Sequence, residues 1–525
     1  LLSGQFPVRL NPTFLNGYGY ADAIMYPTLF LYFPAALRLL HVSLTVAYQL
    51  FIFAINLATA GLAYTCAKRL LRRRDLAIFL SAAYTLCLYR LICIFTRAAV
   101  GELIAMAFLP AVLLGMYEVF FGDEKRGRRW LILGFTGVVN SHVLSVEMAA
   151  VICLLFALAN VRRLAELRRL AALLTSAIAV AALGAWVLVP MAHIGSTDLN
   201  VMHSFPNAAA DAVYPAEMFA TFVDALGLSG DLYAPYTGMP LSVGGILGIG
   251  ALLFLFGRYL LRRDEDGEAA RLGSLGLGGL KLAAVALFLA STLFPWTYIS
   301  KIPGLGRLLV SVQFPWRWFC IASVALVLTL TAAVSYIARG SQNRRRAILV
   351  ACALVVMASA SPYIDGYMQN SGQTAALANK LAPLYSGHLG GQEYLRQGTA
   401  KSALESRPPV VEPSGEARVT RFSRDFTNAE FTYENAAPGD YAELPLYYYP
   451  GYAARDADGG ALTVGAGENG VVRVDLPSGG GSVSVSYREP LSYRVSEIIS
   501  LLALIILTAL YLRSKIKVNK FLREE

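Results

Sequence analysis

Charged residues are scarce in this sequence. Asp, Glu, Lys and Arg make up 15% of the 525 residues, whereas 56% of the residues are hydrophobic. Soluble domains contain about 25% charged and about 45–50% apolar residues. The composition therefore excludes a soluble enzyme built from several globular domains.

Cysteine is also scarce, and its distribution excludes a disulfide framework and a metal-binding cysteine motif. All six cysteines lie in apolar runs, and none occurs between 362 and 493. Their spacing matches neither a framework of bridges nor a zinc site, so we expect small buried hydrophobic residues. The six are Cys66, Cys87, Cys93, Cys153, Cys320 and Cys352.

Repeats and nucleotide-binding loops are absent from the sequence as well. No self-similarity at the period of a solenoid is present. The glycine-rich piece 273–279 borders a predicted helix and lacks the preceding strand that a nucleotide-binding loop requires. We therefore expect a linker at 273–279.

Long apolar runs dominate the remainder of the sequence. A membrane-spanning helix needs about 20 apolar residues, and nine runs approach or reach that length. They are 44–66, 76–95, 101–121, 170–191, 241–260, 280–299, 316–338, 347–361 and 494–513. The sequence predicts a multi-pass membrane protein.

Basic residues gather beside these apolar runs. Of the 45 Lys and Arg residues, 26 lie in six short clusters, at 68–74, 125–129, 162–169, 258–271, 339–346 and 513–523. Such clusters mark cytoplasmic loops. The net charge of +10 is therefore explained by membrane topology, and a nucleic-acid-binding face is not expected.

The basic clusters also predict which loops lie outside. With the clusters in the cytoplasm, the run 44–66 must pass inward, and residues 1–43 are extracytoplasmic. We expect a signal sequence or a first transmembrane helix upstream of Leu1. Pro27 and Pro34 interrupt the apolar segment 26–41, so we expect a helix on the outer membrane surface there.

Residues 130–160 are flanked on both sides by cytoplasmic clusters. A single helix cannot return to the side that it left, and two helices of about 15 residues reach only about 23 Å each. A membrane hairpin with Asn140, Ser141 and His142 at or near its tip satisfies both constraints. Polar groups at that depth require a protein or water-filled environment.

The stretch 362–493 is hydrophilic and rich in turns. Alternating runs such as 471–474 and 483–487 are bounded by glycine-rich turns, which indicates antiparallel strands. We predict an extracytoplasmic, β-sandwich-like domain that is β-rich from about 415, followed by a last transmembrane helix and a basic tail at 494–525. The whole fold is then mainly α: a bundle of about 11 membrane helices within 44–361 and 494–513, with this domain appended.

The short loop between the runs 76–95 and 101–121 contains both Arg97 and Glu102. A guanidinium group can hold a phosphate through paired donors, and a carboxylate can bind a divalent cation or accept a proton. An ion pair that caps two helices explains the same residues. Charges at a membrane border deserve a functional hypothesis, so both interpretations stay open.

Several further residues are weaker candidates. His142 could bind a phosphate or carry a proton, or it could satisfy a carbonyl at a helix break. Asp22, two residues after Tyr20, could line a substrate site or act as a turn residue. Arg317 could bind a ligand or snorkel beside its two tryptophan neighbours. The loop 192–240 contains five acidic residues, which we expect to be solvated charges of the loop. They are Asp198, Asp211, Glu217, Asp224 and Asp231.

Six short motifs follow one another along the chain. They are Gly4–Arg9 (GQFPVR), Gly17–Tyr20 (GYGY) with Tyr26 and Pro27, Arg97–Glu102 (RAAVGE), Ser141 with His142, Gln313–Arg317 (QFPWR) and Tyr447–Tyr452 (YYYPGY). In this ordered set, which spans nearly the whole chain, the protein resembles the bacterial "6-pyruvoyl-tetrahydropterin synthase-related" membrane proteins, close to the YfhO-like proteins. The five scattered histidines do not match the zinc-binding histidines of the soluble pterin enzyme.

This family in turn resembles the GT-C class of membrane glycosyltransferases. The resemblance implies a polyprenyl-phosphate sugar donor, chemistry outside the cytoplasmic membrane, and an essential aspartate in the first extracytoplasmic loop. That acidic motif would lie upstream of Leu1. The surface helix expected at 26–41 matches the helix that ends this loop in the class.

We therefore expect an integral protein of the bacterial cytoplasmic membrane that transfers a sugar to a cell-envelope glycan or polymer. Arg97 would hold the donor phosphate, Glu102 would orient Arg97 or bind a divalent cation, and His142 would line the lipid-phosphate pocket. Asp22, Tyr20 and Arg317 are candidate substrate-lining residues. Two alternatives remain: a transporter or flippase for a lipid-linked sugar, and a non-catalytic protein of envelope glycan assembly.

Overall fold

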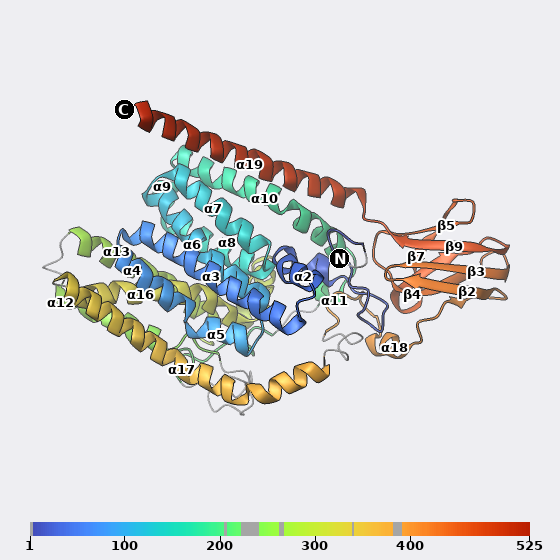
Figure 1. Ribbon diagram of the computed structural model, residues 1–525, viewed down its shortest axis with the longest axis horizontal. Helices are drawn as coiled ribbons and strands as arrows, with labels where there is room; N and C mark the ends of the chain where they lie inside the picture. Colours follow the sequence, from blue (N-terminus) through green and yellow to red (C-terminus); the bar gives the residue numbers. More distant parts are fainter. Residues whose placement is uncertain are drawn as a thin grey trace. The chain divides into compact units, whose positions relative to one another are not determined.

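The computed structural model describes residues 4–203, 207–221, 241–261, 267–338, 341–381 and 391–524. The protein is mainly helical with a β region near the C-terminus, as predicted (Figure 1). The chain divides into two compact units. The helical unit comprises Leu29–Val180 and Phe205–Thr374, and the β-containing unit comprises Leu1–Thr28, Ala181–Ser204 and Ala375–Glu525.

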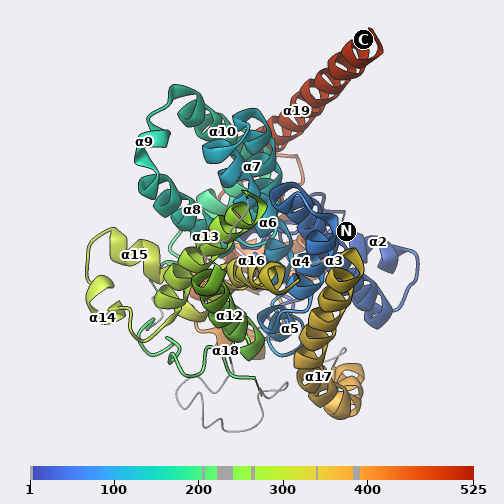
Figure 2. The ribbon, with the colours of Figure 1, turned by 90° about the vertical axis from the view of Figure 1, so that its left-hand side faces the viewer.

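The helical unit is built around two almost fully buried helices, α6 and α16. Helix α16 packs against α4, α5, α12 and α13, and Figure 2 shows it end-on among these neighbours. The elements of this unit are η1 Leu29–Leu31, α2 Tyr32–Leu39, α3 Leu44–Leu71, α4 Arg74–Thr85, α5 Leu88–Phe95, α6 Val100–Phe121, α7 Glu124–Val139, α8 Val143–Ala159, α9 Val161–Leu164, α12 Gly245–Leu261, α13 Gly267–Ala290, α14 Trp296–Ile299, α15 Leu305–Val310, η2 Pro315–Trp318 and α16 Phe319–Ile337. Helices α10 (Leu167–Gly195) and α17 (Gln342–Leu381) begin here and continue into the other unit.

Within the described residues, eight helices are long and apolar enough to cross a membrane. They are Leu44–Leu71, Arg74–Phe95, Val100–Phe121, Leu167–Gly195, Gly267–Ala290, Pro315–Ile337, Gln342–Gln369 and Leu491–Arg513. The prediction of about 11 spans also counted the run 241–260 and both helices of the hairpin. Helices α12 and α8 have only 17 residues each, and the first turns of α7 carry most of a basic cluster, so none of the three reaches the length and apolarity of the eight.

The linker expected at 273–279 is wrong, because these glycines lie inside α13. The expected span 280–299 accordingly shifts to Gly267–Ala290, and the chain turns before Trp296. The missing side chains permit close packing: a Cβ on Gly276 would lie 2.4 Å from the Phe254 ring and 2.6 Å from the Ala332 Cβ. Gly276 therefore lies in a helix–helix contact of the kind that membrane bundles use.

The predicted tip of the hairpin lies where α7 ends and α8 begins. Helix α7 ends at Val139, α8 starts at Val143, and the three residues between them are Asn140, Ser141 and His142. Their exposed fractions are 2%, 1% and 5%. The protein interior therefore surrounds these polar groups, as their predicted depth requires.

The candidate span Arg74–Phe95 is interrupted. Helix α4 ends at Thr85 and α5 begins at Leu88, and Cys87 between them has the extended angles φ −63° and ψ 141°. The apolar run contains no proline or glycine at this point. Local sequence therefore gave no sign of the break, which separates two helical halves within one apolar segment.

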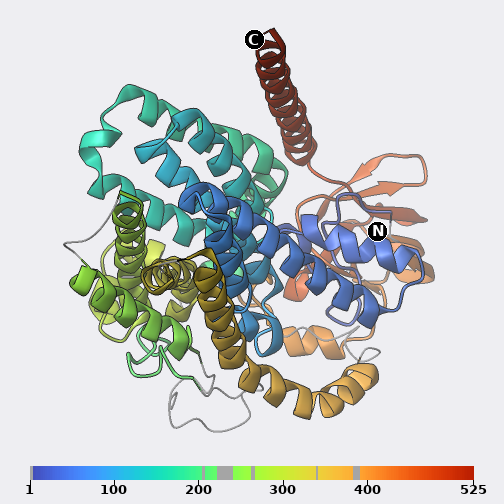
Figure 3. The ribbon, with the colours of Figure 1, turned by 60° about the vertical axis from the view of Figure 1, so that its left-hand side comes forward.

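Helix α17 crosses the domain boundary that was expected near 361. It runs from Gln342 to Leu381 and contains Pro362. Figure 3 shows this gold helix changing direction along its course. Proline removes one backbone hydrogen bond and clashes with the preceding turn, so it can bend a helix without ending it.

The β-containing unit holds two antiparallel sheets. Their orders are β1-β4-β8-β7 and β2-β3-β9-β5-β6 (Figure 1). The strands are β1 Glu412–Pro413, β2 Arg418–Asp425, β3 Asn428–Ala436, β4 Tyr441–Tyr447, β5 Tyr452–Asp456, β6 Ala461–Leu462, β7 Val464–Ala466, β8 Val471–Asp475 and β9 Gly479–Tyr487. The remaining elements are α1 Asp22–Met25, α11 Asn200–His203, α18 Lys401–Ser406, η3 Glu468–Gly470 and α19 Leu491–Glu524.

Both sheets contribute to one hydrophobic core, as in a β-sandwich. Alternate residues of β9 point inward, as the period-two pattern predicts, with Val483 and Val485 almost fully buried. In β8 both Val472 and Val474 are fully buried, but the adjacent Val471 is buried as well. The predicted β domain is therefore present, from 412 to 487. The N-terminal segment joins the same core through Leu10, Leu15, Tyr18 and Tyr20.

Candidate functional site

Arg97 lies in the short connection between α5 and α6. The connection is tight, because the Arg97 amide donates to the Ile92 carbonyl at 2.9 Å and the Ala99 amide donates to the Cys93 carbonyl at 2.8 Å. Ala98 adopts a positive φ of 46°, which is costly for a residue with a Cβ. The surroundings hold this strained backbone in place, and the Arg97 side chain reaches both α5 and α6.

Arg97 and Glu102 form a buried ion pair with a tyrosine beside it. Arg97 Nη1 lies 2.9 Å from Glu102 Oε2 and donates to the Tyr89 hydroxyl at 2.9 Å. The Tyr89 hydroxyl donates to Glu102 Oε1 at 2.6 Å. Glu102 is 1% exposed. The ion pair that the sequence suggested is therefore present, with Tyr89 as a third partner, but it makes no side-chain cap on the first turn of α6.

Arg317 approaches the same carboxylate from η2. Its Nε lies 3.8 Å from Glu102 Oε2, while its Nη1 donates to the Val312 carbonyl and to Gln313 Oε1. The guanidinium carbon lies 5.1 Å from the centre of the Phe314 ring. The motif 313–317 thus folds back on itself and presents Arg317 to the ion pair, so that two guanidinium groups share one carboxylate.

His142 completes the polar cluster. Its Nδ1 is 2.8 Å from the Ser145 hydroxyl, and the charged side chains that act on it electrostatically are Glu102, Arg317 and Arg97. We refer to Tyr89, Arg97, Glu102, His142 and Arg317 together as the polar cluster. Four of these five were candidates from the sequence, and the structure brings all four together.

Tyr89 is the member that the sequence did not reveal. It lies in an apolar run directly after the helix break and is fully buried. Its hydroxyl meets Glu102 only because α5 packs against α6. No local pattern distinguishes this tyrosine from the other 27 in the chain.

What the polar cluster can bind depends on which of its donors and acceptors already take part in hydrogen bonds. Glu102 accepts hydrogen bonds at both oxygens, so it orients Arg97. All hydrogen bonds that Arg97 makes with described residues leave from Nη1. Its Nε and Nη2 have no acceptor among those residues. A guanidinium held at one nitrogen presents its remaining donors to an anion, and phosphate fits that geometry.

Arg90 is a second buried cation, outside the polar cluster. It is fully buried, donates to Asn56 Oδ1 at 2.9 Å, and lies 5.6 Å from the centre of the Tyr84 ring. Its Nε and Nη1 have no hydrogen-bond partner among the described residues. It therefore takes no part in holding Glu102.

Asp22 and Tyr20 belong to the β-containing unit, whereas the polar cluster belongs to the helical unit. Tyr20 is 5% exposed, packs against Phe14 and Tyr394, and accepts a hydrogen bond from the Tyr394 amide at 3.0 Å. These contacts place Tyr20 in the core of the β-containing unit. Asp22 opens the short helix α1, and its Oδ1 is buried without a hydrogen-bond partner among the described residues.

The acids of the loop 192–240 do not form a site within the described residues. Asp198 pairs with His203 at 2.6 Å, with both side chains exposed, whereas Asp211 and Glu217 belong to the helical unit. Glu217 is only 9% exposed, so the expectation of solvated loop charge is wrong for this residue. Asp224 and Asp231 lie outside the described residues, as do Arg262, Arg263 and Arg339 of the basic clusters. In the part of the chain that is described, no three His, Cys, Asp or Glu residues gather as a metal site, and Glu102 has no second carboxylate beside it.

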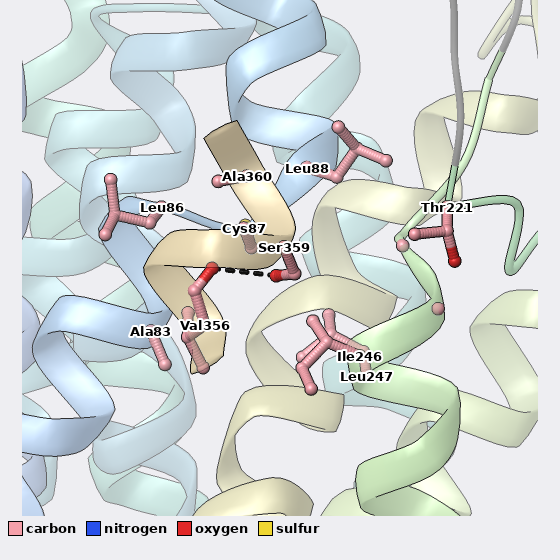
Figure 4. A pocket seen from close by; sticks show the side chains of 12 residues that line it. Ala83, Leu86, Cys87, Leu88, Thr221, Ile246, Leu247, Val356, Ser359 and Ala360 are labelled. Atoms are coloured by element: carbon pink, nitrogen blue, oxygen red, sulfur yellow. Dashed lines mark hydrogen bonds between the residues drawn. The ribbon is translucent and has the colours of Figure 1, made fainter. Parts of the chain in front are cut away.

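A small hollow lies elsewhere in the helical unit, next to the break between α4 and α5 (Figure 4). Leu86, Cys87 and Leu88 line it on one side, and Val356 and Ser359 of α17 on another. It has an empty volume of about 370 Å³, part of which is open to solvent. None of the residues of the polar cluster lines it.

The six sequence motifs sort into two groups in the structure. The motifs at 97–102, 141–142 and 313–317 meet in the polar cluster. The motifs at 4–9, 17–20 and 447–452 belong to the β-containing unit, where the Tyr447 amide donates to the Tyr18 carbonyl at 2.7 Å. The first group is polar and buried among membrane-type helices; the second ties the N-terminal segment to the sandwich.

No protein-family model matches this chain, and no curated protein matches its sequence. The resemblance to the YfhO-like proteins and to the GT-C class therefore stays a prediction.

Proposed function

We propose that this protein transfers a sugar from a polyprenyl-phosphate donor to an acceptor of the cell envelope, at the outer face of the bacterial cytoplasmic membrane. The observation that carries the proposal is Arg97, which is anchored through one nitrogen to Glu102 and Tyr89 and has its other donors uncommitted among the described residues. It sits at the end of an apolar helix of spanning type. A lipid phosphate arrives at the same boundary.

Phosphate is the ligand that best suits the polar cluster. Two guanidinium groups lie near one carboxylate, and buried arginines attract anions strongly because the local dielectric constant is low. Arginine binds phosphate oxygens through parallel hydrogen bonds. His142 adds a neighbouring ring that can donate a hydrogen bond.

The reaction follows from this placement. An acceptor hydroxyl attacks the anomeric carbon of the donor sugar, and the bond between that carbon and the phosphate oxygen breaks. The electron pair leaves with the lipid phosphate, whose charge Arg97 stabilises. Phosphate is a good leaving group, so positioning and charge stabilisation supply most of the acceleration. Glu102 and Tyr89 keep Arg97 in place.

The test is sugar transfer by the purified full-length protein in nanodiscs, with a radiolabelled polyprenyl-phosphate sugar and envelope glycan as acceptor. Arg97→Lys keeps the charge but loses the planar fork, so the transfer rate should fall at least about 100-fold while the protein remains folded. Arg168→Lys, on the exposed residue pair Arg168–Glu166, is the matched control and should keep its activity.

Two results would contradict the proposal. One is an Arg97→Lys variant that transfers sugar at the rate of the wild type. The other is a loss of activity that parallels a loss of folded protein, because the ion pair then serves stability alone.

A second candidate function is transport of a lipid-linked sugar across the membrane. It is favoured by the break between α4 and α5 inside one apolar segment, since discontinuous membrane helices are a feature of transporters. Proteoliposomes separate the two functions. A transporter moves a labelled lipid-linked sugar between leaflets without an acceptor, whereas a transferase leaves the donor in place until an acceptor is added.

A further inference from the structure

Arg90 carries a positive charge inside the apolar segment Arg74–Phe95. Its side chain is fully buried, and Nη2 donates to Asn56 Oδ1 at 2.9 Å. Its Nε and Nη1 have no hydrogen-bond partner among the described residues. A guanidinium group stays charged at any physiological pH, and a buried charge without a counter-charge strongly destabilises a fold. The described residues therefore leave this charge uncompensated.

The side chain of Arg90 turns back toward the break between α4 and α5. Arg90 is the third residue of α5, and side chains of an α-helix lean toward its N-terminus. The guanidinium carbon lies 5.6 Å from the centre of the ring of Tyr84, in the last turn of α4. Arg90 also acts electrostatically on the thiol of Cys87, which lies at the break itself. The charge is therefore located at the break.

The start of α5 offers two further donors at this point. Cys87 gives this eight-residue helix no side-chain cap. The amides of Arg90 and Leu91 donate to the Cys87 carbonyl at 3.0 Å and 3.3 Å, whereas those of Leu88 and Tyr89 make no hydrogen bond within the described residues. The first amides of a helix carry partial positive charge and attract anions.

A hydroxyl group from another helix lies beside the same break. Ser323 of α16 is fully buried and acts on the Cys87 thiol. Its Oγ makes no hydrogen bond within the described residues. The unpaired groups around the break are thus guanidinium nitrogens, backbone amides and a hydroxyl, all of which can donate. Donors gathered in this way are the surroundings that an anion requires.

The hollow in Figure 4 reaches the break from outside. Cys87 and Leu88 line it, and part of its volume is open to solvent. The segment that leads into α12 closes the opposite side, where a Cβ on Gly244 would lie 3.2 Å from the Leu88 Cβ. Because Arg90 itself is fully buried, a small ion suits this place better than a lipid headgroup, which carries glycerol and acyl chains.

We propose that a small inorganic anion, with chloride as the simplest case, binds at the break between α4 and α5. Arg90 donates to it from Nε and Nη1, and the amides of Leu88 and Tyr89 complete the site. The anion compensates the buried charge and fixes the first turn of α5. The hydroxyl of Tyr89, in that turn, bonds to Glu102, so the anion also steadies one member of the polar cluster.

The test is thermal unfolding of the full-length protein in a nonionic detergent, with chloride replacing gluconate at constant ionic strength. Gluconate is too bulky for a fully buried site. The Tm of the wild type should rise by about 2–4 °C up to about 100 mM chloride and then level off. Arg90→Met removes the charge, so its Tm should not depend on chloride. Arg168→Met, at the exposed pair Arg168–Glu166, is the matched control and should keep the rise.

Crystals of the wild type grown in bromide provide a readout that needs no variant to fold. Anomalous scattering should show a bromide ion against Arg90 Nε and Nη1. A wild-type Tm that ignores chloride, or an equal rise in Arg90→Met, overturns the proposal. Stabilisation by phosphatidylglycerol but not by chloride, lost in Arg90→Met, also overturns it and identifies a lipid phosphate instead. None of these measurements involves sugar transfer, so their failure leaves the proposed function untouched.

Discussion

Asp22 is a single residue whose environment makes stability depend on pH. Burial raises the pKa of its carboxyl group from 3.8 to about 6, and hydrogen bonds, including one with Asn11, compensate only in part. The folded state thus binds this proton more tightly than the unfolded chain does. The contribution of the neutral Asp22 carboxyl group to the stability of the fold is therefore fully present below about pH 4, and it is lost as the pH rises through 6.

Asp22→Asn should remove this pH dependence, because the amide stays neutral. Between pH 4.5 and 7.5 the wild type should lose on the order of 2 kcal/mol of local stability, whereas the variant should lose much less. Hydrogen exchange of residues 11–26, corrected for the intrinsic effect of pH, measures the local opening free energy. Parallel slopes for the two proteins would show that Asp22 is not the group responsible.

At the scale of elements, the glycines of α13 determine how closely three helices approach. Gly276 faces Phe254 of α12 and Ala332 of α16. At Gly278, two residues later, a Cβ would have no atom of another described element within 4 Å. Within one helix, Gly276 is therefore closely packed against its neighbours and Gly278 is not. This difference is invisible in the sequence, where both belong to one glycine-rich run.

Gly276→Val should destabilise the helical unit by about 1–3 kcal/mol, because its side chain would overlap the Phe254 ring. Gly278→Val is the matched control and should change stability by less than about 0.5 kcal/mol. Thermal unfolding in detergent, followed by the fluorescence of a thiol-reactive dye on the buried cysteines, compares the two variants. Equal unfolding temperatures would mean that α13 can move away from its neighbours at no cost.

At the scale of the whole molecule, the basic clusters predict the topology. Residues 1–43, 192–240 and 362–493 should lie outside, and all six clusters should face the cytoplasm. In a cysteine-free background, Ala165→Cys and Ser402→Cys place one exposed thiol in a basic cluster and one in α18. A membrane-impermeant maleimide added to intact cells should label position 402 and not position 165. Labelling of position 165 from outside would contradict the topology and, with it, the outer placement of the polar cluster.

Much of the fold could be predicted because the relevant signals are local. Hydropathy over about 20 residues marks a membrane helix, and alternation over five or more residues marks a strand. The strands β8 and β9 and the turn at 140–142 therefore lie where the sequence places them. The run 280–299 was misplaced because glycine, which weakens an isolated helix by about 1 kcal/mol, is favoured where two membrane helices touch.

The sequence by itself determined that the chain contains membrane-type helices and a separate β region, and it singled out Arg97, Glu102, His142 and Arg317. Only the tertiary structure decided that these four residues meet, that Tyr89 joins them, and that Tyr20 packs in a different core. It also distinguished Arg97, which pairs with Glu102, from Arg90, which bonds to Asn56. The physical reason is that hydropathy and charge belong to single residues and short windows. The contacts of Glu102 include the Tyr89 hydroxyl, 13 positions away on another helix, and Glu118 pairs with Arg69, 49 positions away. Only the packing of helices brings such side chains beside the carboxylate.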